Sequence, residues 1–153
     1  MIRQIRPQDA EALLELVNSV GIFSSNEEEE IKNRLDEHFQ GQSRSLWIAY
    51  GEKRLEGVLY SIPEPMTHGT WNVLMLLVRE GSQGKGIGSS LMKEAQKLLA
   101  EQKARMLVVE TSGTDGFEGA QRFYVKCGFT EVARIPEFYD ADDDKVIFTK
   151  TIL

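Results

Sequence analysis

Hydrophobic and polar positions follow two different periods along this chain, and the change between them predicts its secondary structure. Residues 1–6 alternate as a short strand does, whereas apolar residues recur at helical spacing over 10–20 and again over 31–39. Gly21 ends the first helical segment, and Ser-Asn-Glu-Glu at 25–28 predicts a capping box at the start of the second. The opening part of the chain is therefore expected to form one strand and two helices.

The middle of the chain changes to the period of strands. Residues 46–50 and 55–62 predict an antiparallel hairpin with its turn at 51–54, and residues 70–78 predict a third long strand. The other expected elements are a helix with Ile87, Leu91, Ala95 and Leu98 on its apolar face, a strand at 106–110, a helix at 117–126, and strands at 129–135 and 146–153 with a turn at 140–144. The order βααβββαβαββ predicts an α/β fold, a mixed sheet with helices on both faces.

Composition and charge narrow the class of protein. A length of 153 residues fits one domain over 1–153. The first residues lack the apolar core of a signal peptide, and no run approaches the ~20 apolar residues of a membrane helix. The net charge of -6 argues against a nucleic-acid partner. Cys127 is the single cysteine, which excludes an internal disulfide and favours a reducing cytoplasm. His38 and His68 lack partners at metal-ligand spacing, so no metal is expected.

A glycine-rich turn follows the strand expected at 70–78. It reads Ser-Gln-Gly-Lys-Gly-Ile-Gly-Ser-Ser over 82–90 and precedes a helix. A strand, such a turn and a helix commonly form a phosphate cradle, because unpaired backbone N–H groups and the helix dipole both favour an anion there. A nucleoside triphosphate, a dinucleotide and the pyrophosphate of coenzyme A are the three candidate ligands.

Two of these ligands fit the residues less well. A nucleoside-triphosphate loop needs Ser or Thr after its Gly-Lys pair, but Gly86 follows Lys85, and Arg79 stands where the first glycine belongs. The dinucleotide pattern gains from Glu110, which ends the next strand about where a ribose-binding acid is expected. However, Ser89 replaces its third glycine, and no second βαβ half follows.

Two motifs together resemble the GNAT N-acetyltransferase superfamily. Gln83-x-x-Gly86-x-Gly88, between a strand and a long helix, is similar to its acyl-CoA signature. Ala-Gln-Arg-Phe-Tyr-Val-Lys-Cys-Gly-Phe at 120–129 is similar to its Ala-x-x-Phe-Tyr-x-x-x-Gly-Phe block, and Ile-Arg-Pro-x-Asp at 5–9 also agrees. The resemblance covers nearly the whole chain. It implies a sheet that splays between its fourth and fifth strands.

By this resemblance the chain is expected to move an acetyl group from acetyl-CoA directly to a primary amine, a small molecule rather than a protein. An alternative is a sensor that binds acyl-CoA without catalysis. Glycines without a β-carbon let the pyrophosphate approach the backbone, and the resemblance implies that the pantetheine arm pairs with the fourth strand. The expected cofactor-binding residues are Leu77, Val78, Gln83, Gly84, Lys85, Gly86, Ile87, Gly88 and Ser89.

The resemblance also implies the catalytic groups. Tyr124 matches the general acid that meets the departing thiolate, and its alternative role is a core phenol hydrogen-bonded to backbone. Relatives with a glutamate base place it six residues before the position of Val78, where this chain has Asn72. Glu110 is our candidate base, while Glu64 and a water chain to solvent are alternatives.

The amine acceptor is expected to bind between the first two helices and the final hairpin turn. Aromatic walls with acids suit a cationic amine, such as a polyamine, an aminoglycoside or a lysine side chain. An acidic turn is also what any solvated turn looks like, and this interpretation is favoured. The aromatic residues are Phe23, Trp71, Phe138 and Tyr139, and the acids are Glu137, Asp140 and residues 142–144. We expect no nucleic-acid or membrane partner, and the chain could form a homodimer.

Overall fold

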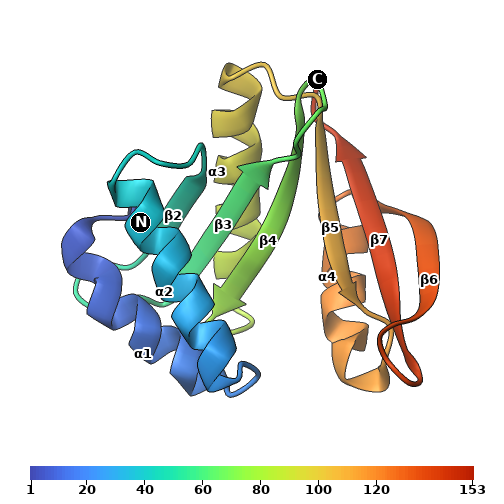
Figure 1. Cartoon of the computed structure of the whole chain (residues 1–153), viewed down its shortest axis with the longest axis horizontal. Helices are drawn as coiled ribbons and strands as arrows, with labels where there is room; N and C mark the ends of the chain where they lie inside the picture. The colour runs from blue at the N-terminus through green and yellow to red at the C-terminus, as the bar shows by residue number, and fades with distance from the viewer. The chain divides into compact units, whose positions relative to one another are not determined.

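The computed structural model describes residues 1–153, and the order of its elements is the predicted one (Figure 1). The strands form one mixed sheet in the order β1-β2-β3-β4-β5-β7-β6, which confirms the fold class. The strands are β1 (Ile2–Gln4), β2 (Leu46–Tyr50), β3 (Gly57–Pro63), β4 (Thr70–Val78), β5 (Met106–Ser112), β6 (Thr130–Asp140) and β7 (Asp143–Thr151). The helices are α1 (Ala10–Val20), α2 (Ser25–Phe39), α3 (Ile87–Glu101) and α4 (Glu118–Lys126), with 3₁₀ turns at Pro7–Asp9 and Asp115–Phe117.

The chain divides into two compact units. The first unit comprises Met1–Ile62 and Met75–Ala95, and the second comprises Pro63–Leu74 and Gln96–Leu153. β4 and α3 contribute to both units, because the division falls within these elements. One domain over residues 1–153 stays a prediction. None of the helices has the length and apolar character that crossing a membrane requires.

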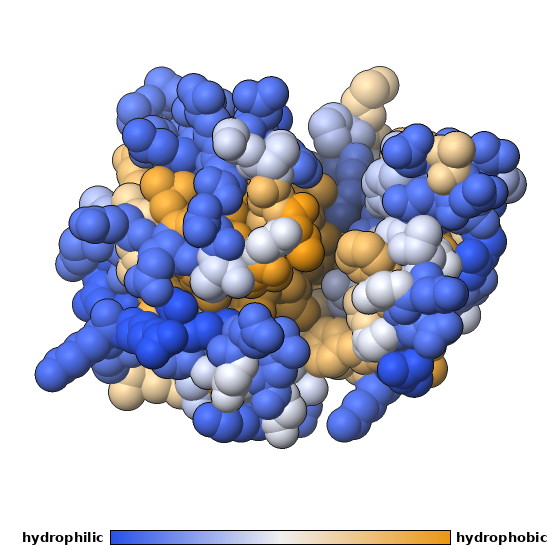
Figure 2. Space-filling view, turned by 90° about the horizontal axis from the view of Figure 1, so that it is seen from below, coloured by the Kyte–Doolittle hydropathy of each residue, from blue (hydrophilic) through white to orange (hydrophobic).

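In the first unit, helices cover both faces of the strands. β2 pairs antiparallel with β1 and with β3, so that Tyr50 lies opposite both Ile2 and Gly57. α1 and α2 lie in front of these strands in Figure 1 and α3 lies behind them. Hydrophilic residues cover most of the face visible in Figure 2, with hydrophobic residues in patches between them. The most deeply buried residues of the core between the strands, α1 and α2 are Leu13, Leu16, Val17, Leu35, Trp47, Ala49, Leu55 and Val58.

In the second unit, β4 pairs with β5. These strands are parallel, and residues 70–73 lie opposite 106–109. A parallel pair at this place in the sheet fits the predicted splay. β5 pairs antiparallel with β7, and β7 pairs with the outer strand β6. All residues of β6 are exposed, and its register with β7 shifts twice.

Two features of the helices differ from the prediction. The capping box is formed by Ser24 and Glu27 rather than one residue later: Glu27 N donates to Ser24 Oγ at 3.2 Å, and Ser24 N donates to Glu27 Oε1 at 3.0 Å. Two consecutive serines each have a glutamate three residues on, so the local pattern alone does not distinguish them. On α3, the buried stripe ends at Leu99, which is 0% exposed, and not at the half-buried Leu98.

The hairpins also differ from the prediction. β3 begins at Gly57, which makes the first loop longer than 51–54. The closing strands are longer than predicted and their turn is tighter, because Asp140 and Asp143 pair across the hairpin and only Ala141 and Asp142 lie between them. Polar residues suggested a longer turn, but an exposed edge strand carries polar residues along its whole length.

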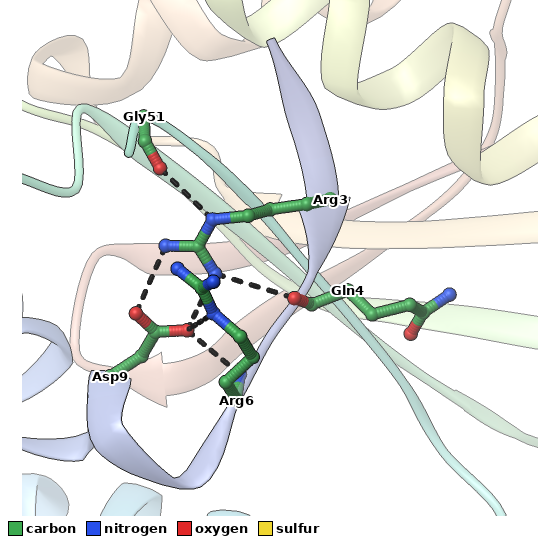
Figure 3. A network of polar contacts seen from close by, with 5 residues as sticks. All are labelled: Arg3, Gln4, Arg6, Asp9 and Gly51. Atoms are coloured by element: carbon green, nitrogen blue, oxygen red, sulfur yellow. Dashed lines mark hydrogen bonds and ion pairs between the residues drawn. The ribbon is translucent and has the colours of Figure 1, made fainter. Parts of the chain in front are cut away.

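A polar network fixes the corner between β1 and the first helical turn (Figure 3). Arg3 donates from Nη1 and Nη2 to the two carboxylate oxygens of Asp9 at 2.6 and 2.9 Å, and from Nε to Gly51 O at 3.2 Å. Arg6 N also donates to Asp9, at 2.7 Å. Burial alone would raise the pKa of Asp9, but these hydrogen bonds and the charges of Arg3 and Arg6 outweigh burial and hold the pKa below its usual value.

Candidate functional site

The glycine loop between β4 and α3, in the first unit, presents a row of free backbone donors. Ser90 N donates to Gly86 O at 3.0 Å and closes the first turn of α3. The six N–H groups before it, from Gly84 to Ser89, have no hydrogen-bond partner in the chain. Such groups at a helix start carry the positive end of the dipole, so this loop is built to receive an anion.

Two glycines give the loop its shape and keep its surface open. Gly84 and Gly86 both have φ of +80°, a left-handed conformation that other residues adopt only with strain. A β-carbon placed on either glycine would meet no atom within 4 Å, so the backbone faces open space. A diphosphate can therefore approach the peptide groups closely, and successive N–H groups in such a turn form a concave anion site.

Arg79 anchors the start of the loop. This side chain is only 4% exposed; its Nε donates to Leu55 O at 3.0 Å and its Nη1 to Glu15 Oε1 at 3.0 Å. Its backbone N donates to Glu56 O at 2.8 Å, and Ser82 Oγ donates to the Glu56 carboxylate. From sequence, Arg79 counted only against a nucleotide loop, because the residues that it contacts lie far away along the chain.

The predicted loop residues differ in what they expose. Gln83 donates from Nε2 to Val78 O at 3.3 Å, which ties the loop back to the end of β4. Lys85 is exposed and has no partner. Ile87 is only 6% exposed and packs against Gly57 and its neighbours, so only its backbone N–H is available to a ligand.

Tyr124 lies in the second unit. Its ring is packed against other aromatic rings, and its hydroxyl has no hydrogen-bond partner in the chain. The centroids of the Phe129 and Phe148 rings lie 5.9 and 5.8 Å from its own. The hydroxyl makes no hydrogen bond within the chain, so the alternative of a phenol bonded to backbone is not what the structure has. Burial, and secondarily Cys127, raises the pKa of Tyr124 to about 12. The phenol is therefore a protonated donor at neutral pH.

A carboxylate network lies in the same unit. Asn72 Nδ2 donates to Glu64 Oε1 at 3.0 Å and to Glu110 Oε2 at 3.3 Å, and Lys145 Nζ lies 2.5 Å from Glu110 Oε1. Asn72 is 4% exposed. Glu110, the candidate base, and Glu64, its alternative, are therefore bound by the same Asn72 amide group. Lys145 was missed, because only the pairing of β5 with β7 brings it to Glu110.

Most of the residues predicted for the acceptor site are either packed in the core or bonded to residues near the closing turn. Phe23 packs against the core of the first unit, and Trp71 is only 2% exposed. The acids of the closing turn bond locally: Asp144 accepts from Glu137 N at 3.0 Å, and Asp143 accepts from Ser112. These contacts support the interpretation of the acids as turn structure. The exposed aromatic residues are Phe138, 51% exposed, and Tyr139, 46% exposed.

The family of the chain follows from comparison with known proteins. A family profile described as the acetyltransferase (GNAT) domain matches residues 42–131, which include the glycine loop, β4, β5 and α4. The chain belongs to the GNAT acetyltransferases. As a member of this family the protein is an acyl-CoA-dependent acyltransferase, and the donor that the family uses is acetyl-CoA. A comparison with curated proteins found no match.

Solved structures agree with this assignment. A GNAT-family protein from Desulfovibrio desulfuricans is 28% identical to this GNAT chain, with a TM-score of 0.94 over 100% of this chain and 99% of that one. An aminoglycoside 6'-N-acetyltransferase in complex with coenzyme A is 18% identical, with a TM-score of 0.80 over 100% and 97% of the two chains. The ribosomal-protein-alanine N-acetyltransferase of Brucella melitensis is 17% identical, with a TM-score of 0.78 over 99% of each chain. The last two likenesses show the fold alone.

Proposed function

We propose that this protein is an N-acetyltransferase that moves the acetyl group of acetyl-CoA directly to a primary amine. The observation that carries the proposal is the row of six unpaired N–H groups, from Gly84 to Ser89, at the start of α3. A row of this kind suits the pyrophosphate of the donor. The expected roles of Leu77 and Val78 toward the pantetheine arm, and of Gln83 and Lys85 in the loop, are part of this proposal.

Direct transfer makes three demands on the chain. The amine must lose a proton before it attacks the thioester carbon, the carbonyl oxygen must be polarised, and the departing sulfur must be stabilised. In balance, an ammonium ion and acetyl-CoA give an amide, coenzyme A and one proton. One ammonium proton goes to a base, a second leaves the nitrogen as the C–S bond breaks and ends on sulfur, and the third stays in the amide.

Tyr124 suits the third demand. With a pKa of about 12 it stays protonated throughout the physiological range. A free thiol titrates near ~8.5, so leaving the phenol ionised after full transfer to the thiolate would be unfavourable by roughly 5 kcal/mol. We therefore assign Tyr124 the role of a hydrogen-bond donor to the sulfur, which relays the proton that the nitrogen releases.

The acceptor is proposed to be a small molecule with a primary amine. The aminoglycoside N-acetyltransferase shares this fold, and so does the ribosomal-protein-alanine N-acetyltransferase, whose title names a protein acceptor. The exposed rings of Phe138 and Tyr139 offer aromatic surface for a compact cation, and Lys145 already lies over the Phe138 ring in this manner. We also propose a cytoplasmic location, because the chain has one cysteine and no disulfide. A homodimer stays a prediction.

Ligand-dependent stability tests the donor assignment. Acetyl-CoA is expected to raise the melting temperature, since binding at a hundredfold excess over Kd stabilises by about 2.7 kcal/mol. ATP and NAD are expected to have no effect. Stabilisation by NAD and none by acetyl-CoA would instead support a dinucleotide site.

Turnover then separates an enzyme from an acyl-CoA sensor. Release of coenzyme A is measured with kanamycin, spermidine and a peptide with a free N-terminal alanine. Release with at least one amine is expected of the enzyme. Stabilisation by acetyl-CoA without release on a broad panel of amines would favour the sensor.

A further inference from the structure

Asn72 holds two carboxylates on one amide group in the second unit. Its Nδ2 donates to Glu64 at 3.0 Å and to Glu110 at 3.3 Å. An ionised carboxylate accepts hydrogen bonds and donates none, so the amide must turn its nitrogen toward both acids. Asn72 is 4% exposed and lies opposite Val108 in the paired part of β4. The sheet therefore fixes the point at which the two carboxylates meet.

Glu110 has a partner on each carboxylate oxygen. Oε1 forms an ion pair with Lys145 Nζ at 2.5 Å, and Oε2 accepts a hydrogen bond from Asn72 Nδ2. The Lys145 ammonium also lies 4.0 Å above the centroid of the Phe138 ring, so it is held from two sides. With a side-chain exposure of 15% for Lys145 and 25% for Glu110, this pair is largely shielded from solvent. Glu110 is thus a fixed, charge-compensated group.

Glu64 has a partner on one carboxylate oxygen only. Oε1 accepts from Asn72, and Oε2 has no hydrogen bond and no ion pair. Its backbone is fixed as well, because Glu64 N donates to Thr70 O and Thr67 Oγ1 donates to Glu64 O, both at 2.8 Å. The side chain is half-buried. The result is a carboxylate with one oxygen anchored and the other open to a proton donor.

We propose that Glu64 is the general base of the acetyl transfer and that Asn72 is the positioning residue that aims it. Glu110 does not act as the base, because its carboxylate is ion-paired with Lys145. The proposal rests on the proposed function, because a base is needed only if the chain acetylates amines. It replaces Glu110 as our candidate.

The chemical step balances with these groups alone. Glu64 Oε2 takes one proton from the ammonium ion of the acceptor, and the freed lone pair forms the C–N bond at the thioester carbon. The C–S bond breaks with its electrons on sulfur, which receives the second nitrogen proton through Tyr124. Glu64 then returns its proton to solvent. The acceptor class is therefore an aliphatic amine, which is an ammonium ion at neutral pH and needs such a base.

Matched amide variants test the assignment. Glu64→Gln and Glu110→Gln each keep an acceptor for the Asn72 amide and remove one carboxylate, and Glu101→Gln on the exposed end of α3 is the surface control. Glu64→Gln is expected to lower kcat on the best amine by about 10²-fold with an unchanged KM for acetyl-CoA, and Glu110→Gln by less than about 10-fold. With hydroxylamine, which is mostly uncharged at neutral pH, the deficit of Glu64→Gln should shrink to less than about 5-fold.

Asn72 is tested through its coupling to Glu64. Asn72→Ala should lower kcat more than it raises the KM of the acceptor, and adding it to Glu64→Gln should cause little further loss, because both changes act on one group. The two single variants and the double variant form a double-mutant cycle. If Asn72→Ala does not fold, Asn72→Ser, which keeps a short hydrogen-bond donor, takes the place of Asn72→Ala in this cycle.

Three results would overturn the assignment: wild-type kcat in Glu64→Gln, a larger loss in Glu110→Gln than in Glu64→Gln, or additive losses in the cycle. A wild-type protein that releases no coenzyme A with any amine, hydroxylamine included, fails the proposed function itself, and the base assignment falls with it.

Discussion

At the scale of single residues, buried polar side chains differ in whether their hydrogen-bonding atoms are bound within the chain or are free to bind a ligand. Tyr124 is packed by aromatic rings while its hydroxyl makes no hydrogen bond. Asp9 shows the opposite case, because both of its oxygens are bound by Arg3. The first pattern is expected of a group kept for a ligand, and the second of a group that holds the fold together.

Tyr124→Phe should separate binding from turnover. Phenylalanine keeps the ring packing and removes only the hydroxyl, so stability and acetyl-CoA affinity should stay nearly unchanged. Turnover should fall by on the order of 10²-fold, the usual scale for a positioned proton donor. The measurements are calorimetric titration with acetyl-CoA and release of coenzyme A. Because the Tyr124 phenol acts in its protonated form, its ionisation should not lower the wild-type rate until the pH approaches its pKa of about 12. Equal turnover in variant and wild type would deny Tyr124 this role.

Asp9→Asn should destabilise the protein in a pH-dependent manner. It leaves the Arg3 guanidinium without its buried counter-ion, at a cost of about 2–4 kcal/mol at neutral pH. The pKa of Asp9 is lowered from 3.8 in the folded chain, so its contribution is complete above that value and is lost as pH falls through the lower folded pKa. Urea unfolding of both proteins should therefore converge in acid. Glu30→Gln, in the exposed pair with Arg34, is the control and should change stability by less than ~0.5 kcal/mol.

At the scale of elements, the glycine loop and the first turn of α3 act as one unit. Arg79, Glu56 and Ser82 hold the entry of the loop, and Gly84 and Gly86 turn its N–H groups outward. The loop was predictable from sequence because glycine spacing between a strand and a helix is a local pattern. Its anchor was not, because Leu55, Glu56 and Glu15 reach Arg79 only after the unit has folded.

Gly88→Asp is the sharpest test of this element. Gly88 lies in the first turn of α3 without the left-handed backbone of Gly84 and Gly86, so an aspartate there should not strain the backbone. An acid in a first helical turn is even favourable for the helix. Acetyl-CoA affinity, measured by calorimetry, should fall by about 10²-fold, since charge and volume both oppose the pyrophosphate. Ser90→Asp adds the same charge where the N–H is already paired, and it should weaken binding by less than about 5-fold. Unchanged affinity in a folded Gly88→Asp would remove the pyrophosphate from this loop.

At the scale of the whole molecule, the order of elements and the family were predictable, and the contacts of the candidate base were not. The spacing of apolar residues along a helix or a strand is set by which face of that element is buried, so it can be read from the sequence of the element alone. Sheet pairing brings Asn72, Glu110 and Lys145 together from three strands, and the connection from β3 to β4 adds Glu64. No local pattern marks such a group. The family motif pointed to the position of Asn72, and the structure shows what that residue contacts.

The exposed outer strand β6 has a consequence for solubility. An edge strand with unpaired backbone groups is a template on which further chains can add and aggregate. Here Pro136 lacks an N–H near the middle of the strand, and the two register shifts bend it away from a flat edge. Charged Glu131, Arg134 and Glu137 recur along it and disfavour stacking of identical copies. The chain can therefore leave this strand uncovered and still resist open-ended growth into fibres.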